Sequence, residues 1–337
     1  MDVLSEVLKV IRLDGALFFN AELTAPWCLT EPHGNEIAPG LSPGATHLVL
    51  YHYVLSGRLT ARLPGDAPLM LSAGDVVIVP HGDPHILSSG PPEKPVDAVK
   101  TFEKNLSEGL KLTRFGGGGE VTRLVCGYLV CEPRLAEVLL SGLPRIMTLH
   151  LADDTAGQWL ANSIQYSVGE GNGKADGGDL VTAKLSEVMF VETLRRYINS
   201  LPAEQVGWLA GARDTVVGQA LALLHREPAA EWAIESLARR VGVSRTRLAE
   251  RFKHFLDDSP MAYLAKWRLR LGAESLLSTE SSIAEIAAAV GYGSESTFNR
   301  AFKREYRVPP AQFRRGKKRG LIASVEAKGD LCERSEK

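Results

Sequence analysis

The side chains best suited to chemistry lie on one short segment near the C-terminus of this 337-residue chain. Between Ser294 and Tyr306, the aromatic Phe298 and Phe302 recur at helical spacing and define a buried face. The remaining positions of the same helix carry Glu295, Ser296, Asn299, Arg300 and Lys303. Amide and guanidinium groups on an exposed helix pair with base edges, and lysine binds phosphate. The segment is therefore a candidate for reading DNA, and packing between helices is the alternative.

A second, shorter helix must position this one. Ser282 and Glu285 stand in S-x-x-E spacing, which is a capping box at a helix start. Apolar residues then repeat at helical spacing until Gly291, a residue suited to ending a helix. Two short helices joined by a glycine-containing turn predict a helix-turn-helix at residues 283–306.

An internal repeat supports the DNA-reading interpretation. Residues 234–242 match residues 283–291 at an offset of 49, and after one extra turn residue the match resumes at 50. The residues paired at the second offset are Ser244 with Ser294, Leu248 with Phe298, Phe252 with Phe302, Lys253 with Lys303, Pro260 with Pro310 and Tyr263 with Phe313. The repeat predicts a first helix-turn-helix at residues 234–255.

Between the two copies, residues 259–278 predict one connecting helix that starts with Ser-Pro. The 19 residues from Ser259 to Leu277 span about 28 Å at 1.5 Å per residue. One turn of B-DNA is roughly 34 Å, so a single chain can place two recognition helices in successive major grooves.

Residues 213–316 resemble the DNA-binding domain of the AraC/XylS transcription regulators. The resemblance rests on the segments IESLARRVGVSRTRLAERFK, SPMAYLAKWRLRLGAESLL and SIAEIAAAVGYGSESTFNRAFKREYRVPPAQFRR. It implies seven helices, of which the third and sixth read DNA. The positions it places against bases are Thr246, Ala249, Glu250, Ser296, Asn299 and Arg300.

Two positions depart from the family pattern. Ala233 stands where relatives often carry a hydroxyl cap, and Ala249 offers no hydrogen bond to a base. For the others, we expect Arg300 to pair with guanine, Asn299 with adenine, and Glu250 with a cytosine amine. The residues expected to hold phosphates are Arg245, Arg247, Lys253, Lys303 and Arg304.

The charge distribution agrees with this reading. The net charge of the chain is only −1. Residues 213–319 contain 20 Lys and Arg against 12 Asp and Glu, whereas the rest of the chain contains 19 against 28. A basic C-terminal domain on an acidic N-terminal one favours phosphate contact by the former.

The N-terminal part predicts strands. Residues 45–55 and 58–63, split by Ser56-Gly57, predict a hairpin, and residues 68–71 and 75–79, split by Ser72-Ala73-Gly74, predict another. Residues 74–85 resemble the second cupin motif, G-x5-P-x-G-x2-H, with Ser89 in place of its final Asn. That resemblance implies a ligand-sensing cupin-type barrel over about residues 15–132. The Gly-rich residues 90–119 predict a mobile loop or lid.

Four histidines raise the question of a metal. The first cupin motif is incomplete, because His47 and His52 lack the H-x-H pair and the following Glu. A metal needs three or four convergent ligands, and His85 with His47, His52 or His81 supplies two or three. We therefore expect no metal and no cofactor, and assign His52 and His85 to an effector pocket.

Cys126 and Cys131 are candidates for a redox site. Five residues apart on one strand, their side chains point to opposite faces, which disfavours a bridge between them. Two buried, inert thiols are one reading, and a thiol that senses oxidant is the other.

Residues 135–143, 159–168 and 180–199 predict helices, with a flexible loop at residues 169–179. An apolar stripe on the last helix, from Val181 to Ile198, fits either packing against the barrel or a homodimer seam. The predicted organisation is a sensor and dimerisation domain at 1–202, a linker at 203–212, the DNA-binding domain at 213–316, and a disordered tail at 317–337.

No secretory leader and no membrane span is expected, because Asp2 and Glu6 interrupt the N-terminus and no long uncharged apolar run follows. The fold class is α+β multidomain, with a cupin-like barrel and an all-α double helix-turn-helix. We expect a cytoplasmic, non-enzymatic transcription regulator that binds double-stranded DNA and a small-molecule effector, forms a homodimer, and contacts RNA polymerase if it activates. The alternatives are a redox-sensing regulator and a cupin metalloenzyme with a DNA-binding tail.

Overall fold

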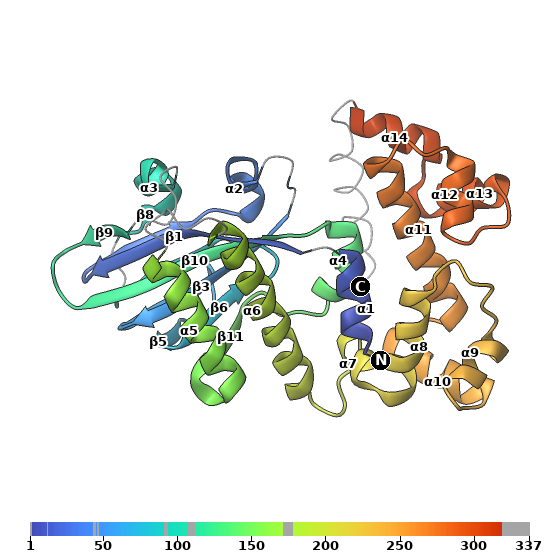
Figure 1. The fold of residues 1–337 in the computed structure, drawn as a ribbon, viewed down its shortest axis with the longest axis horizontal. Helices are drawn as coiled ribbons and strands as arrows, with labels where there is room; N and C mark the ends of the chain where they lie inside the picture. Colours follow the sequence, from blue (N-terminus) through green and yellow to red (C-terminus); the bar gives the residue numbers. More distant parts are fainter. Residues whose placement is uncertain are drawn as a thin grey trace. The chain divides into compact units, whose positions relative to one another are not determined.

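The computed structural model describes residues 2–11, 13–42, 45, 47–90, 94–106, 112–170 and 178–318. The chain divides into two compact units: one runs from Ile11 to Leu201, and the other from Pro202 onward together with Met1–Val10 (Figure 1). The α+β multidomain class is confirmed, with sheets in the first unit and helices in the second. Among the described residues, no helix combines the length and hydropathy needed to cross a bilayer.

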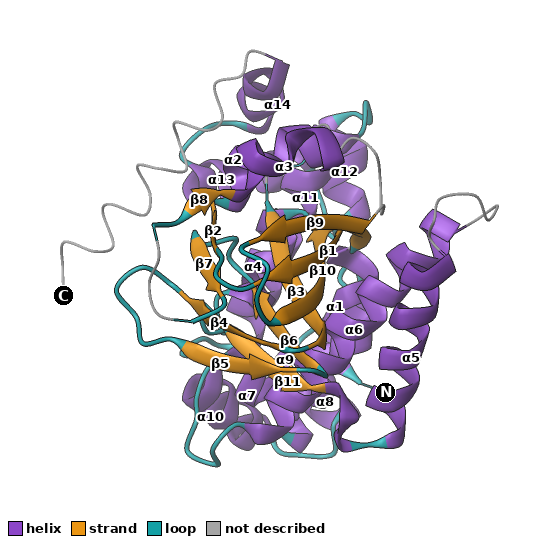
Figure 2. Ribbon diagram, turned by 90° about the vertical axis from the view of Figure 1, so that its left-hand side faces the viewer, coloured by secondary structure: helices purple, strands orange, loops and turns teal. Residues whose placement is uncertain are grey.

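The first unit contains two sheets (Figure 2). The larger has the order β11-β6-β3-β10-β1-β9 and comprises β1 (Asp14–Thr24), β3 (Leu48–Ser56), β6 (Asp75–Val79), β9 (Leu112–Gly116), β10 (Val121–Val130) and β11 (Met147–His150). The smaller has the order β5-β4-β7-β2-β8 and comprises β2 (Cys28–Glu31), β4 (Arg58–Arg62), β5 (Leu69–Ser72), β7 (His85–Ser88) and β8 (Val96–Asp97). Buried apolar residues from both sheets form one core. The described strands thus make two facing sheets, which do not close into one continuous barrel.

Both predicted hairpins are wrong. β3 pairs with β10 and β6, whereas β4 pairs with β5 and β7, so the Ser56-Gly57 turn carries the chain from one sheet to the other. The turn at Ala73-Gly74 does the same between β5 and β6. The two corners are hydrogen-bonded together, since Ala73 N donates to Gly57 O at 3.1 Å and Gly74 N to Val54 O at 2.9 Å. A glycine turn permits the reversal, but the partner of each strand is set by the core.

The expected lid at residues 90–119 is also wrong for the part that is described. This part forms β8, helix α3 (Ala98–Leu106) and β9. Phe102 of α3 is buried, with its ring centroid 4.8 Å from Phe19 and 5.5 Å from Phe115. Residues 91–93 and 107–111 lie outside the described part of the chain.

Helix α1 (Val3–Ile11) is grouped with the second unit except for its last residue. The other helices of the first unit are α2 (Gly34–Leu41), α4 (Pro133–Leu140), the 3-10 helix η1 (Leu151–Asp153), α5 (Thr155–Glu170) and α6 (Gly178–Ser200). α6 packs on β1 and β10. Gly15 allows this close approach, because a Cβ there would lie 2.8 Å from Ser186 Cβ. Tyr51 also contacts α6, with its Oη 2.5 Å from Ser186 Oγ. Of the predicted loop at 169–179, residues 171–177 lie outside the described residues.

The second unit is helical. After α7 (Trp208–Arg213), the described residues up to Lys318 form seven helices, as the resemblance implied: α8 (Thr215–Arg226), α9 (Ile234–Arg240), α10 (Arg245–Leu256), α11 (Pro260–Ser278), α12 (Ile283–Ala289), α13 (Glu295–Tyr306) and α14 (Pro310–Lys318). The predicted linker at 203–212 is wrong over α7, because Trp208 and Leu209 are buried in this unit. The predicted tail begins inside α14, and residues 319–337 lie outside the described part.

Candidate nucleic-acid interface

Side-chain caps fix where each recognition helix starts. Ser244 Oγ accepts a hydrogen bond from Arg247 N at α10, and Ser294 Oγ accepts one from Thr297 N at α13, both at 3.2 Å. α12 has the predicted capping box, in which Ser282 N donates to Glu285 Oε2 at 2.7 Å and Glu285 N donates to Ser282 Oγ at 3.2 Å. The bonds that Ser282 N and Ser282 Oγ donate to this carboxylate lower the pKa of Glu285. α9 has half of this arrangement, because Ala233 N donates to Ser236 Oγ at 3.0 Å but the methyl side chain of Ala233 cannot accept a bond in return.

The predicted base-reading positions lie on the outer faces of α10 and α13, opposite the side chains that each helix buries. Leu248 and Phe252 of α10, and Phe298 and Phe302 of α13, are completely buried. Of the predicted base-reading residues, Ala249 and Asn299 are half-buried and the others are exposed: Thr246, Glu250, Ser296 and Arg300. The two recognition helices therefore each present a polar face to solvent, as the helical periodicity predicted.

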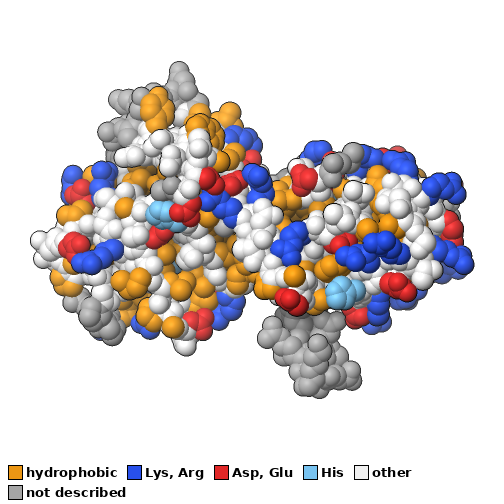
Figure 3. Space-filling view, turned by 90° about the horizontal axis from the view of Figure 1, so that it is seen from below, with side chains coloured by type: hydrophobic (Ala, Val, Ile, Leu, Met, Phe, Trp, Pro, Cys, Tyr) orange, Lys and Arg blue, Asp and Glu red, His pale blue; other side chains and the backbone are white. Residues whose placement is uncertain are grey.

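The predicted phosphate-binding residues are all exposed, but their surroundings differ between the two copies. In the first copy, Arg245 lies 3.4 Å from Glu235, and Lys253 lies 2.5 Å from Asp257. In the second copy, Lys303 and Arg304 form no ion pair with any described residue. Lys and Arg side chains are also spread over the face of the helical unit seen in Figure 3. The cations of the second copy are thus freer to meet phosphates.

Arg251 is a residue of the helical unit that the sequence reasoning missed. It forms an ion pair with Asp214, the N-cap of α8, whose Oδ1 also accepts from Val217 N at 2.8 Å. Partial burial alone raises the pKa of Asp214, but the bonds from Arg251 and the backbone lower it overall. Asp214 before Thr215 was readable as a cap, but its ion pair spans 37 residues and has no local signature.

In the sheet unit, two of the candidate histidines meet. His52 Nε2 lies 2.7 Å from His85 Nε2, and His52 Nδ1 lies 2.8 Å from Cys126 Sγ. His85 Nδ1 lies 2.9 Å from the carbonyl of Asp83, which can only accept. His85 therefore carries its proton on Nδ1, so His52 donates from Nε2 and Cys126 donates its thiol proton to His52.

Burial keeps this chain of hydrogen bonds neutral. It lowers the pKa of His52 well below its usual value, and lowers that of His85 to about 4. Burial raises the pKa of the Cys126 thiol well above its usual value and that of Cys131 to about 12. A protonated thiol is a poor nucleophile, which disfavours oxidant sensing. The redox role and the effector pocket both stay predictions.

The remaining histidines lie elsewhere. His47 Nε2 is 3.0 Å from Pro80 O, and His81 Nε2 is 3.1 Å from Leu143 O. Cys126 and His85 contact opposite nitrogens of His52, so the three cannot surround one ion. Among the described residues, no three His, Cys, Asp or Glu side chains are placed to hold a metal. The sequence reasoning missed Glu31, which pairs in register with His85 and whose pKa burial raises to about 7.

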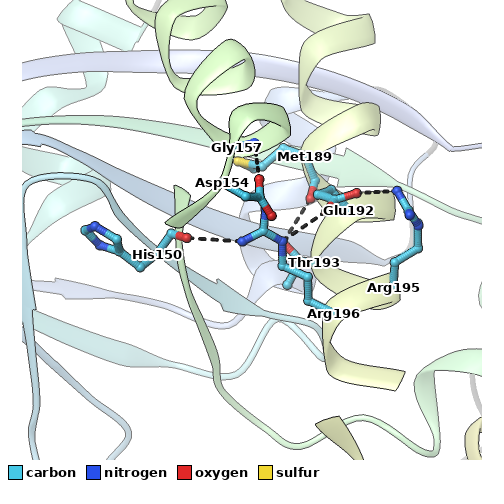
Figure 4. Close-up of polar contacts among 8 residues, drawn as sticks. All are labelled: His150, Asp154, Gly157, Met189, Glu192, Thr193, Arg195 and Arg196. Atoms are coloured by element: carbon cyan, nitrogen blue, oxygen red, sulfur yellow. Dashed lines mark hydrogen bonds and ion pairs between the residues drawn. The ribbon is translucent and has the colours of Figure 1, made fainter. Parts of the chain in front are cut away.

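A pocket of about 380 Å³ lies on the outer surface of α5 and α6. Its lining residues are Trp159, Asn162, Ser163, Tyr166, Ser167, Val181 and Leu185. Arg196 of α6 donates to Asp154 Oδ1, directly before α5, at 2.8 Å, and within α6 it donates to Glu192 Oε1 at 3.0 Å (Figure 4). The pocket therefore sits on a braced helix pair.

Two capped recognition helices, repeated on one connecting helix and preceded by a two-sheet unit, define a DNA-binding protein with a separate N-terminal domain. Comparison with known proteins agrees. A cupin family model matches residues 2–199, and a helix-turn-helix domain model matches residues 237–316. The chain belongs to the AraC-like transcription regulators: it is a DNA-binding regulator of the AraC type with a cupin N-terminal domain.

The relatives support the assignment along nearly the whole chain. A putative AraC-like transcription regulator of Streptomyces lividans is 34% identical over 80% of this chain and 88% of its own length. Another, of Streptomyces antibioticus, is 33% identical over 94% of this chain and 99% of its own length. Among solved structures, an AraC-type transcriptional regulator of Chromobacterium violaceum is 27% identical and covers 32% of this chain and 96% of that chain, with a TM-score of 0.30.

Proposed function

We propose that this regulator reads its operator with both α10 and α13, one in each of two successive major grooves. The observation that carries the proposal is the duplication: two capped helices with polar outer faces stand at either end of one 19-residue helix. At 1.5 Å per residue that helix is about 28 Å long, near one turn of B-DNA.

Within this arrangement, Arg300 pairs with a guanine and Asn299 with an adenine, while Glu250 accepts from a cytosine amine. Asn299 Nδ2 lies 3.4 Å from Glu295 Oε1, a long contact that limits the rotation of the amide before DNA arrives. The exposed cations Arg245, Arg247, Lys253, Lys303 and Arg304 contribute affinity without sequence information.

The test uses a duplex that the full-length protein selects from a random library. We expect Arg300→Ala to weaken binding by about 1–3 kcal/mol and to relax the preference at one base position. Lys303→Ala is the matched control from the same helix. It should weaken binding to all DNA sequences equally, and it should lower the salt dependence of the binding constant by about one counterion. Equal affinity of Arg300→Ala and the unchanged protein for the selected duplex contradicts the assignment.

We also propose that α5 and α6 form a homodimer seam. α6 buries Leu185, Leu194 and Ile198 toward its own unit, yet leaves apolar side chains outward beside those of α5. The exposed set is Trp159, Tyr166, Leu180, Val181 and Val188. Clustered exposed apolar groups of this kind mark association surfaces, and closed twofold pairing is the commonest oligomer.

Sedimentation of two variants tests the seam. Val188 is 43% exposed on α6, and Val96 is 38% exposed on β8, so the same change can be made inside and outside the proposed seam. We expect Val188→Glu to convert the dimer into a monomer and Val96→Glu to leave the dimer intact. A Val188→Glu variant that sediments like the unchanged protein refutes the seam.

We place the protein in the cytoplasm, where its DNA is, and assign effector sensing to the sheet unit near His52 and His85. A compound that enters there must part these rings, because they lie in contact between the two sheets. Compounds that raise the melting temperature should then change hydrogen exchange in β3 and β7. Stabilising compounds that change exchange only in the helical unit would count against this location.

A further inference from the structure

The turn of the second helix-turn-helix lies against the loop that precedes the first. Gly291 ends α12 with a φ of +85°, and a Cβ added to it would lie 2.7 Å from Ala229 Cα and 2.9 Å from Ala229 O. Real Cβ atoms do not approach backbone so closely. The glycine is therefore needed twice, once for its left-handed backbone and once for the space.

Arg268, near the middle of α11, anchors the same loop. Its Nε donates to Pro228 O at 2.7 Å and its Nη2 to Ala230 O at 2.8 Å. The same Nη2 would lie 2.9 Å from a Cβ at position 291. Burial lowers the pKa of this guanidinium, because it is partly withdrawn from water. Ala229, Arg268 and Gly291 thus form one contact, here called the clasp, between the two copies and the connecting helix.

The first copy has no counterpart of the clasp. Gly242 occupies the equivalent turn position with a φ of +72°, but a Cβ there would meet nothing within 4 Å among the described residues. The repeated sequence therefore uses the same glycine for the same turn, and only the second copy also uses it for a contact with the other copy.

We infer that the clasp sets the separation and relative rotation of α10 and α13, and so makes the protein select operators whose two half-sites have one fixed spacing. A single helix such as α11 leaves the two copies free to flex and rotate about its axis. A second attachment beside it removes that freedom before DNA binds, which lowers the entropic cost of placing both helices. The inference rests on the proposed reading by both helices.

The internal repeat supplies a matched pair of variants for the test. Gly242→Ala and Gly291→Ala introduce the same left-handed alanine in the same turn, but only Gly291→Ala collides with Ala229. The probe is the duplex selected by the unchanged full-length protein, together with versions carrying one or two base pairs more or fewer between the half-sites. Binding of each duplex is measured by electrophoretic shift.

We expect the unchanged protein and Gly242→Ala to lose affinity steeply as the spacing departs from the selected one. Gly291→Ala should bind the selected duplex about tenfold more weakly, equivalent to 1.4 kcal/mol, and should show a flatter dependence on spacing. Arg268→Lys, which keeps the charge but cannot bridge both carbonyls, should flatten the dependence without a steric clash.

The outcomes separate the two ideas. If the unchanged protein is insensitive to spacing, the reading by two helices fails. If it is sensitive but Gly291→Ala has the same profile as Gly242→Ala, the clasp inference fails alone. Should Gly291→Ala lack helical circular dichroism, Arg268→Lys decides, and an unchanged spacing profile for that variant overturns the inference.

Discussion

The two helix-turn-helix copies share a backbone plan but differ in what fills their cores. The first copy buries a polar group of three: Trp208 Nε1 donates to Tyr263 Oη at 2.8 Å, and His225 Nε2 lies 2.7 Å from the same oxygen. The second copy buries the rings of Phe298, Phe302 and Phe313, and Phe313 stands at the position of Tyr263. At this position the first core therefore has a hydroxyl that joins an indole and an imidazole, and the second core has a phenyl ring.

The outer faces of α10 and α13, which we propose contact bases, also carry different side chains. At equivalent positions, the first copy carries Thr246, Ala249 and Glu250, and the second carries Ser296, Asn299 and Arg300. Amide and guanidinium groups recognise bases by bidentate hydrogen bonds, whereas an alanine contributes only apolar contact. If these positions face bases as we propose, the two copies should divide the work of specificity unequally.

The largest expected effect compares the two core phenylalanines. Phe302 has ring neighbours at 5.4 Å (Phe298), 4.5 Å (Tyr306) and 5.2 Å (Phe313), whereas the ring of Phe252 lies 6.3 Å from that of Tyr263, its neighbour among the described residues. We expect either change to alanine to cost about 3–5 kcal/mol of unfolding free energy. Phe302→Ala should cost about 0.5–1.5 kcal/mol more, for the lost ring pairs. Hydrogen exchange in α10 and α13 measures each copy separately, and equal losses would remove this distinction.

The second largest expected effect is a loss of stability at low pH that is confined to the first copy. Burial, aided by Arg270, lowers the pKa of His225 to about 3, against about 6.5 when unfolded. Below pH 6.5 the unfolded chain binds a proton that the folded state refuses, so stability falls as the pH falls, until the folded pKa is reached. The slope is about 1.4 kcal/mol per pH unit, or on the order of 2–3 kcal/mol between pH 6 and pH 4.

Residues 260–318, which form α11 to α14, contain no histidine, so the loss should appear in hydrogen exchange of α8 before that of α13. His225→Gln is the control, because its amide reaches Tyr263 Oη but does not titrate in this range. If the variant and the unchanged protein lose protection in α8 at the same pH, His225 does not cause the difference.

The smallest expected effect lies at the helix caps. Ser282 caps α12 through its side chain, whereas Ala233 has no side-chain acceptor for α9. We expect Ser282→Ala to cost about 1 kcal/mol of unfolding free energy, and Ala233→Ser to add up to about 1 kcal/mol. Urea denaturation of both variants measures these two changes in the free energy of unfolding. A neutral Ala233→Ser would mean that Ser236 already satisfies the start of α9.

Sequence reasoning succeeded and failed in different places along the chain. It located the helices of both copies, the Ser282 box and the buried rings Phe298 and Phe302. It failed at the two sheet corners, at Phe102 in the expected lid, and at Trp208 in the expected linker. In each of these segments the local residues are compatible with the predicted structure, but packing against residues far away in the sequence produced a different one.

The amino-acid sequence alone determined the double helix-turn-helix and the polar outer faces of α10 and α13, because helix periodicity, caps and a repeat act over a few residues and leave a local record. Only the tertiary structure decided which strands pair, that His52 meets His85, and that Gly291 touches Ala229 while Gly242 has no such neighbour among the described residues. Those contacts join residues far apart in the chain, and they depend on how whole elements pack rather than on the identity of any neighbour in sequence.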